Sequence, residues 1–255
     1  MATQKQLISL LQARIAQHAD VKVRAWWENY VKHGAAFRGV GIPVIRRELK
    51  EWYREEHIGD LPSGRQLAIA LALFSCRYAE DKIAGILFLQ IYMRDAFDWR
   101  VLLPAFEKLF QKKYIYDWNV CNWFCVRVLG PLIQKHGAQC ARAIARWSTA
   151  ENVWQARCSL AAFATIAKEG TFTPLLLRSA ARLIKRDERF AKTAVGWILR
   201  EMSKADKQVV EMFIKKYAKY FSKESLENAI AYFGKQKKEI CGWCGAVVYS
   251  PRERG

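Results

Sequence analysis

Apolar residues recur at three- and four-residue spacing along almost the whole chain, and this pattern constrains the fold more than any other feature. In QLISLLQARIAQ, the apolar residues Leu7, Ile8, Leu11 and Ile15 recur at this spacing and define one face of a helix. The stretch KIAGILFLQIYM (82–93) is apolar nearly all round, which is typical of a central, buried helix. Further helices are predicted at 20–33, 43–57, 62–75, 99–112, 118–135, 138–147, 151–168, 173–185, 189–203, 206–220 and 223–233.

Short turns rich in Gly and Pro join these helices. One is FRGVGIP (37–43), and in EGTFTP we expect Thr173 to cap the next helix, with Pro174 at its first position. Helix pairs recur at roughly 35–40 residues, the range of HEAT-type units. We therefore predict an all-α fold, an α-solenoid of stacked antiparallel helix pairs (HEAT-like repeats) with a concave basic face. The predicted organisation is a single domain over 1–234 and a short C-terminal extension over 235–255.

The chain is strongly cationic, with 42 Lys and Arg against 24 Asp and Glu and a formal net charge of +18. Residues 1–150 hold 22 cations against 13 anions and residues 151–255 hold 20 against 11, so each part carries +9. The folded body itself is therefore basic, which predicts a large anionic partner, nucleic acid before an acidic membrane. Candidate contacts at helix ends and exposed faces are Arg46, Arg47, Lys192, Arg200, Lys204, Lys215 and Lys216.

Several classes of protein are disfavoured by features that the sequence lacks. No apolar run reaches the roughly 20 residues of a membrane helix, and the N-terminus lacks the apolar run of a signal peptide. The seven cysteines are odd in number and lie mostly in apolar stretches, which predicts buried free thiols in a reducing compartment. Cys241 and Cys244 form a CxxC, but no second ligand pair completes a zinc site, so no metal is predicted.

Three separated stretches hold the candidate site residues: DWNVCNWFCVRVLG (117–130), ENVWQARCSLAAF (151–163) and KTAVGWILRE (192–201). Together with YVKHGAAFRGVGIPVIRREL (30–49), they resemble the AlkD-like DNA alkylation repair family over residues 20–233. The resemblance implies HEAT-like helical repeats around duplex DNA. It also implies that active members cut the N-glycosidic bond of cationic N3- and N7-alkylated purines, without base flipping and without a metal or cofactor.

The resemblance further assigns roles to single residues. The two pocket tryptophans of the family match Trp118 and Trp197, which we expect to be catalytic together with Asn122. The DNA-binding arginine of the family matches Arg157, and its aromatic residue near the N-terminal helix pair matches Tyr30. The catalytic aspartate of the family, four residues after the first tryptophan, falls on Asn122, and there this sequence departs from the pattern.

The departure at Asn122 decides what activity is expected. A carboxylate beside C1′ would stabilise the oxocarbenium ion left when a cationic purine departs, and tryptophan faces attract the same cation. Trp118 and Asn122, at i and i+4, share a helix face. Losing the charge at Asn122 removes roughly 4 kcal/mol at 4 Å and an effective dielectric near 20, or about a thousandfold in rate. Asp117 is expected on another face, about 100° from Trp118, and not to substitute.

Three functions are compatible with these observations. The first is a DNA glycosylase whose activity is reduced or lost through Asn122, the second a non-catalytic HEAT-like protein that binds damaged or distorted DNA, and the third a scaffold for an acidic protein. Each site residue also has a structural interpretation, with both tryptophans in the core and Arg157 as a solvated charge. We expect double-stranded, preferably alkylated DNA as partner, no membrane association, a monomer, and a cytoplasmic, nucleoid-associated location if the source is bacterial.

Overall fold

Helices dominate the structure. The computed structural model describes residues 2–32, 34–234 and 237–243, and the regular secondary structure of these ranges is helical. Within them, an isolated bridge between Ala36 and Tyr78 is the only extended pairing. The predicted all-α fold is thereby confirmed. None of the described helices is both long and apolar enough to cross a membrane.

Internal contacts divide the chain into two compact units, Met1–Val128 (unit 1) and Leu129–Gly255 (unit 2), which are described separately. The single domain predicted for residues 1–234 stays a prediction. The extension predicted for residues 235–255 contains a further helix, α14 (Lys237–Trp243), and its other residues lie outside the described part of the chain.

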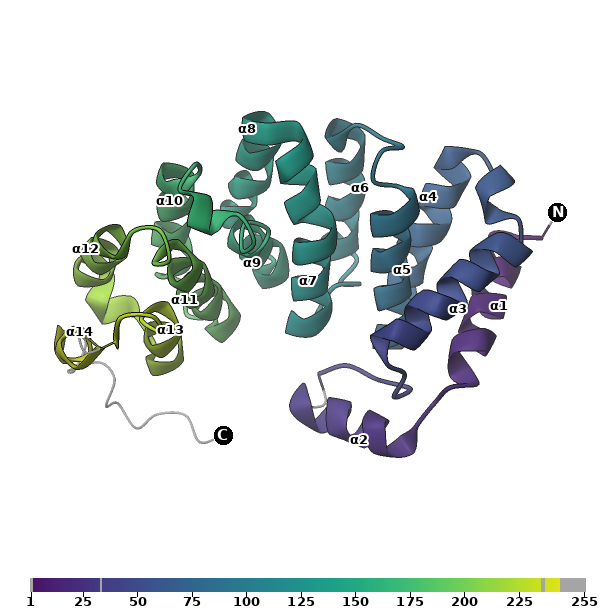
Figure 1. The fold of residues 1–255 in the computed structure, drawn as a ribbon, viewed down its shortest axis with the longest axis horizontal. Helices are drawn as coiled ribbons and strands as arrows, with labels where there is room; N and C mark the ends of the chain where they lie inside the picture. Colours follow the sequence, from purple (N-terminus) through teal and green to yellow (C-terminus); the bar gives the residue numbers. More distant parts are fainter. Residues whose placement is uncertain (1, 33, 235–236, 244–255) are drawn as a thin grey trace. The chain divides into compact units, whose positions relative to one another are not determined.

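Short connections join the helices of both units (Figure 1). Those of unit 1 are α1 (Gln4–Ala16), α2 (Val21–Tyr30), α3 (Ile42–Glu55), α4 (Ser63–Ala72), α5 (Ala79–Tyr92), α6 (Trp99–Gln111) and α7 (Trp118–Phe124). Those of unit 2 are α8 (Gly130–Arg146), α9 (Val153–Ala161), α10 (Thr173–Leu183), α11 (Arg189–Met202), α12 (Lys207–Tyr217), α13 (Lys223–Ala229) and α14.

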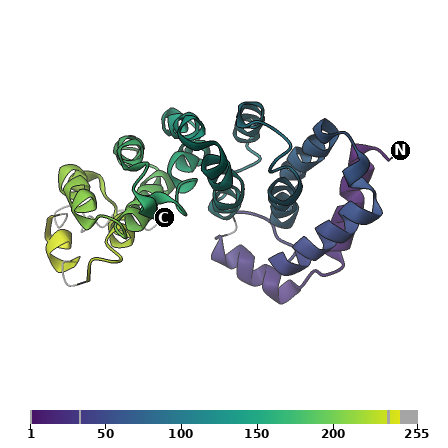
Figure 2. The same cartoon turned by 45° about the horizontal axis from the view of Figure 1, so that its top comes forward.

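In unit 1, α1 packs on α3, α3 on α5 and α5 on α7, while α4 lies along α5. Every residue of α5 from Ala79 to Leu89 is buried, which confirms the predicted central helix. Gly85 allows this close packing, because a Cβ at that position would lie 2.8 Å from the backbone oxygen of Ala70. By contrast, α2 buries none of its residues and lies at the edge of the unit in both views (Figures 1 and 2).

In unit 2, α9, α11 and α13 pack side by side, and α8 and α10 both pack on α9. Helix α10 also contacts α11, and α12 contacts α11 and α14. The approach of α13 to α11 depends on Gly196, since a Cβ there would lie 2.4 Å from the backbone oxygen of Ser225. Helices α8 and α9 thus form one pair and α10 and α11 another, and the two pairs stack on each other.

Buried acidic side chains at the start of α5 hold the FRGVGIP loop. Glu80 Oε1 accepts hydrogen bonds from the three backbone N–H groups of residues 38–40, at 2.9, 2.8 and 3.2 Å. Asp81 accepts two from the guanidinium group of Arg38, at 2.7 and 3.0 Å. Gly39 has a φ of +88°, and a Cβ there would lie 2.1 Å from the backbone oxygen of the residue that caps α2. The loop therefore fixes α2 to the rest of unit 1.

The two largest departures from the predicted helix boundaries follow α7 and α9. The helix predicted for 118–135 is α7, followed by a π-helical segment (Cys125–Leu129) and then α8. The helix predicted for 151–168 ends as α9 at Ala161, because the next turns close with i to i+3 hydrogen bonds such as Phe163 N–H to the Leu160 carbonyl. In both places the residues beyond the break stay apolar, so periodicity does not reveal it.

The predicted cap of α10 was also wrong. Phe172 is the N-cap and Thr173 is the first helical residue. The N–H of Thr173 closes a turn on the Gly170 carbonyl, and the Phe172 carbonyl accepts from the N–H of Leu176. Helical bonding therefore starts one residue before the position expected from the Thr-Pro pair.

Candidate nucleic-acid interface

Two of the predicted site residues lie together on the surface of unit 1. The ring of Tyr30, the last residue of α2, meets the ring of Trp118, the first residue of α7, with centroids 5.3 Å apart and planes at 70°. Tyr30 is 53% exposed and Trp118 is half-buried. The edge-to-face contact therefore places two aromatic side chains where a ligand can reach them.

Two further tryptophans extend this contact into a cluster. Trp26 stacks on Tyr30 with centroids 5.0 Å apart and planes 10° apart. Trp27 meets both rings edge-on, at 4.9 and 5.8 Å, and stacks on the buried ring of Phe37. We call Trp26, Trp27, Tyr30 and Trp118 the aromatic cluster. Sequence reasoning missed Trp26 and Trp27, although the spacing of Trp26 and Tyr30, i and i+4, was the signal that could have found them.

Asn122 lies one turn after Trp118 on α7 and is half-buried. Helix α7 is capped by Asp117, whose Oδ1 accepts from the N–H of Val120 at 2.9 Å. The expectation for Asp117 needs correction, because its φ of −134° and ψ of 158° place it before the helix and not 100° around it. Asp117 is still not expected to replace the carboxylate missing at Asn122, since it is 4% exposed and its carboxylate caps the helix.

The environment of Asp117 is electrostatically unusual. Burial raises the pKa of this carboxyl group to about 6, and Oδ2 is buried with no described hydrogen-bond donor. Burial also lowers the pKa of Lys82, a nearby cation whose charge favours ionised Asp117. Lys82 Nζ donates to the carbonyls of Phe74 and Tyr114, at 2.5 and 2.9 Å. These groups form an interior polar network under α7, out of reach of a macromolecular ligand.

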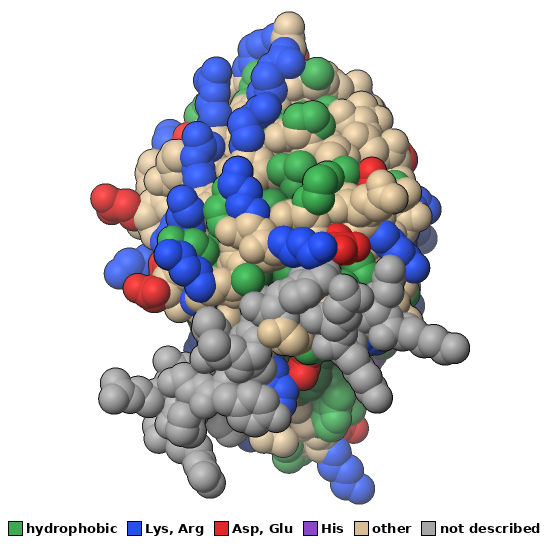
Figure 3. Space-filling model, turned by 90° about the vertical axis from the view of Figure 1, so that its left-hand side faces the viewer, with side chains coloured by type: hydrophobic (Ala, Val, Ile, Leu, Met, Phe, Trp, Pro, Cys, Tyr) green, Lys and Arg blue, Asp and Glu red, His purple; other side chains and the backbone are tan. Residues whose placement is uncertain are grey.

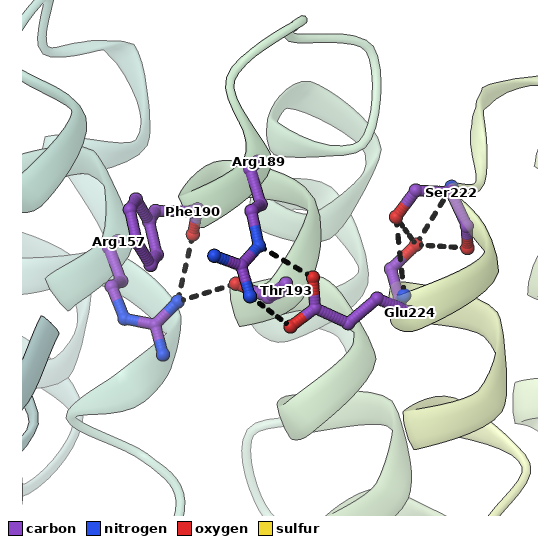
Figure 4. Close-up of polar contacts among 7 residues, drawn as sticks. Arg157, Arg189, Phe190, Thr193, Ser222 and Glu224 are labelled. Carbon is purple, nitrogen blue, oxygen red and sulfur yellow. Dashed lines mark hydrogen bonds and ion pairs between the residues drawn. The ribbon is translucent and has the colours of Figure 1, made fainter. Parts of the chain in front are cut away.

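In unit 2, Arg157 and Trp197 lie together. The guanidinium carbon of Arg157 on α9 lies 5.9 Å from the centroid of the Trp197 ring on α11. Arg157 is only 5% exposed, and its Nη1 donates to the Phe190 carbonyl at 2.8 Å and to Thr193 Oγ1 at 3.1 Å (Figure 4). Arg157 is therefore a positioned, buried cation and not the solvated surface charge that the structural interpretation supposed.

Helix α11, which carries Trp197, is fixed against α13 at two points. Arg189 at its start makes a bidentate ion pair with Glu224, at 2.7 and 2.9 Å (Figure 4). Gly196, immediately before Trp197, provides the close backbone contact with α13 described above. These two contacts set the direction in which α11 presents the half-buried ring of Trp197.

The predicted cations of unit 1 lie on α3. Arg46 is half-buried there. Arg47 is exposed and pairs with Glu48 at 2.9 Å, and Glu48 Oε1 also lies 3.0 Å from His18 Nε2. The charge of Arg47 is thus partly balanced before any ligand binds.

The predicted cations of α11 and of the turn that follows it also differ in exposure and in ion pairing. Lys192 is half-buried. Arg200 and Lys204 both form ion pairs with Glu201, the former at 2.8 Å, and Lys204 also lies over the ring of Tyr232 at 5.1 Å. Arg200 and Lys204 therefore share one anion, which leaves this group a net positive charge.

A larger gathering of cations lies elsewhere in unit 2. Figure 3 looks at the side of the molecule formed by the C-terminal helices and shows a band of Lys and Arg side chains along one edge. Among the lysines of unit 2, Lys185 and Lys216 have ammonium groups 5.8 and 5.7 Å from the centroid of the Tyr217 ring. The exposed cations of α10, α12 and the residues that follow them are Arg178, Arg182, Lys185, Lys207, Lys215, Lys216 and Lys219. Of these, sequence reasoning named Lys215 and Lys216.

Comparison with known proteins connects this geometry to a family. Residues 11–233 match the model of a family described as DNA alkylation repair enzyme. A solved structure of a "predicted DNA alkylation repair enzyme from Enterococcus faecalis" is similar, with a TM-score of 0.73 at 22% sequence identity. The alignment covers 86% of this chain and 98% of that one. No curated protein matches the chain.

Proposed function

Because the chain belongs to the DNA alkylation repair enzyme family, we propose that it releases cationic N3- and N7-alkylated purines from duplex DNA, at a rate limited by Asn122. Membership supports a role in DNA repair and hence DNA binding. The observation that carries the finer proposal is the contact of Tyr30 with Trp118 on an exposed surface, one helical turn from Asn122.

The chemistry needs little from the protein beyond electrostatics. An N3- or N7-alkylated purine leaves as a neutral base, and positive charge passes to the sugar as an oxocarbenium ion. Aromatic faces attract this cation through their quadrupoles, which suits Trp118; Trp197 offers a face of the same kind in unit 2. Arg157, whose Nη1 donates two hydrogen bonds within unit 2, would bind a phosphate of the DNA. Asn122 can orient the attacking water but supplies no negative charge.

A second candidate function is binding to alkylated or distorted DNA without excision. It is favoured by the position of Asp117, the carboxylate nearest in sequence to Trp118 and Asn122. Asp117 caps α7, is buried, and so does not replace the charge missing at Asn122. The two candidates share the DNA-binding surface and differ only in the chemical step.

Replacing Asn122 with Asp separates them. Asn122→Asp should accelerate release of 7-methylguanine or 3-methyladenine from alkylated duplex by up to about a thousandfold, because a carboxylate stabilises the developing cation. Release would be measured in single-turnover assays beside wild type and Asn122→Leu, which removes the polar group and should release no base. A stable Asn122→Asp protein that binds duplex but releases nothing would contradict the glycosylase proposal and leave the second candidate.

The salt dependence of duplex affinity tests DNA binding itself. If cations of the protein replace counterions on the duplex, the slope of log K against log salt should be about −0.9 per phosphate contacted. Binding to random-sequence duplex, followed by fluorescence anisotropy from low to high salt, gives this slope. An affinity that does not change with salt would contradict both candidates.

A further inference from the structure

Three residues of α2 form a stripe of which the family resemblance accounts only for Tyr30. Lys22, Trp26 and Tyr30 lie at i, i+4 and i+8, on one face of the helix, and all three are exposed. At its C-terminal end the stripe reaches Trp118 through the contact of that ring with Tyr30. A cation, an indole and a phenol therefore follow one another along a surface that ends at the candidate site.

Packing within unit 1 accounts for Trp27 but not for Trp26. Trp27 is half-buried and stacks on Phe37 in the core, with centroids 5.6 Å apart. Trp26 is 57% exposed, although its ring is already ordered by parallel stacking on Tyr30. A large aromatic side chain that is ordered and still exposed is typical of a surface that binds a flat, apolar group.

The charges nearby indicate which flat group. Lys22 lies one turn before Trp26, and Lys32 follows Tyr30 by two residues and is exposed. Unit 1 as a whole carries 19 Lys and Arg against 13 Asp and Glu, a net charge of +6. Aromatic rings flanked by cations are the recognised arrangement for a nucleic-acid strand, in which bases stack on the rings and phosphates meet the cations.

We infer that Trp26 and Tyr30 form a stacking platform for one unpaired base of a DNA strand, with Lys22 at its phosphate. This inference rests on the proposed function only in taking DNA as the ligand. The platform would hold a base that is already unpaired, as at a bulge, while the lesion faced by Trp118 stays in the helical stack. A stacked base is held about tenfold or more tightly than one without an aromatic partner.

The test uses the full chain and two duplexes that differ by one base. One is fully paired, and the other carries a single bulged 2-aminopurine, whose fluorescence falls when it stacks on a ring. The wild type should bind the bulged duplex about tenfold more tightly than the paired one and quench the probe. Trp26→Leu should lose both the preference and the quenching, Trp26→Phe should keep most of each, and Val21→Ala, another exposed apolar position on α2, should change neither.

Each other outcome has a definite meaning. Suppose that the wild type binds paired duplex with a normal salt dependence, but Trp26→Leu has the same affinities and the same quenching as the wild type on both duplexes. The platform is then wrong, and the proposed function still stands. If the protein binds neither duplex, the proposed function fails, and the platform fails with it because both require DNA as the ligand. If sedimentation shows a dimer that Trp26→Leu dissociates, a second copy covers the ring and the inference is overturned.

Discussion

Both units contain a bidentate ion pair between an arginine and a carboxylate, Arg38–Asp81 in unit 1 and Arg189–Glu224 in unit 2, and these two pairs differ in burial far more than in geometry. In unit 1, Arg38 meets Asp81 at 2.7 and 3.0 Å, with side chains 10% and 0% exposed. In unit 2, Arg189 meets Glu224 at 2.7 and 2.9 Å, with side chains 54% and 51% exposed. Water screens the second pair but not the first, so equal distances imply unequal contributions to stability.

The units also differ in the kind of surface they offer. Unit 1 exposes aromatic rings and has a net charge of +6, whereas unit 2 has 23 Lys and Arg against 11 Asp and Glu, a net charge of +12. The even +9 on each side of residue 150 came from dividing the chain at an arbitrary position; the division at Val128 separates a more aromatic unit from a more cationic one. We expect unit 2 to contribute more to salt-dependent affinity and unit 1 more to recognition of bases.

The largest effect should follow from breaking the buried pair. Asp81→Ala leaves the guanidinium group of Arg38 without its carboxylate and also removes the acceptor of Gln12, so it should destabilise the protein by about 3–5 kcal/mol. Glu224→Ala removes the exposed counterpart and should cost under about 1 kcal/mol. Urea unfolding of both variants measures the difference. Similar losses in the two variants would show that burial does not distinguish the pairs.

A smaller, pH-dependent effect should come from Asp117. Its pKa rises from 3.8 to about 6 on folding, so the folded protein binds this proton more tightly than the unfolded chain. Its contribution to stability is therefore greatest below pH 4 and is lost as pH rises through 6, by up to about 3 kcal/mol. Asn caps helices as well as Asp does and does not titrate.

Asp117→Asn should accordingly gain stability relative to wild type between pH 4 and pH 7, although loss of the attraction to Lys82 reduces the gain. Unfolding free energies of both proteins at several pH values give the comparison. Parallel profiles would mean that this carboxyl group titrates normally in the folded state.

The third and smallest effect concerns the contact between α11 and α13 next to Trp197. Gly196→Ala puts a Cβ 2.4 Å from the Ser225 carbonyl oxygen, so α13 must shift, at a cost of about 1–3 kcal/mol. The matched control is Gly64→Ala on α4, where an added Cβ meets nothing within 4 Å and a gain of up to about 1 kcal/mol is expected. Thermal melting compares the two, and a neutral Gly196→Ala would show that α11 and α13 separate without cost.

The sequence predicted most helices because a core-facing stripe repeats with the period of the helix, as in α1, and it predicted α5 because that segment is apolar on nearly every side. It missed the π-helical segment after Phe124, since a shift of register among apolar residues leaves the stripe intact. The family resemblance named Tyr30, Trp118, Arg157 and Trp197 as candidate site residues. It did not predict their pairwise contacts, because these depend on packing between helices distant in sequence. The burial of Arg157 was unpredictable for the same reason, because Phe190 and Thr193, which accept its hydrogen bonds, belong to α11.

The clamp made by Glu80 has a consequence for motion. Loop amides usually exchange their hydrogens with solvent quickly, but those of Arg38, Gly39 and Val40 all donate to one oxygen of a carboxylate that is 2% exposed. They can exchange only when the loop lifts away from the start of α5, and then all three are released together. Deuterium uptake at these three amides should therefore be slow and concerted, and its rate would report how often α2, with its rings, detaches from the body of unit 1.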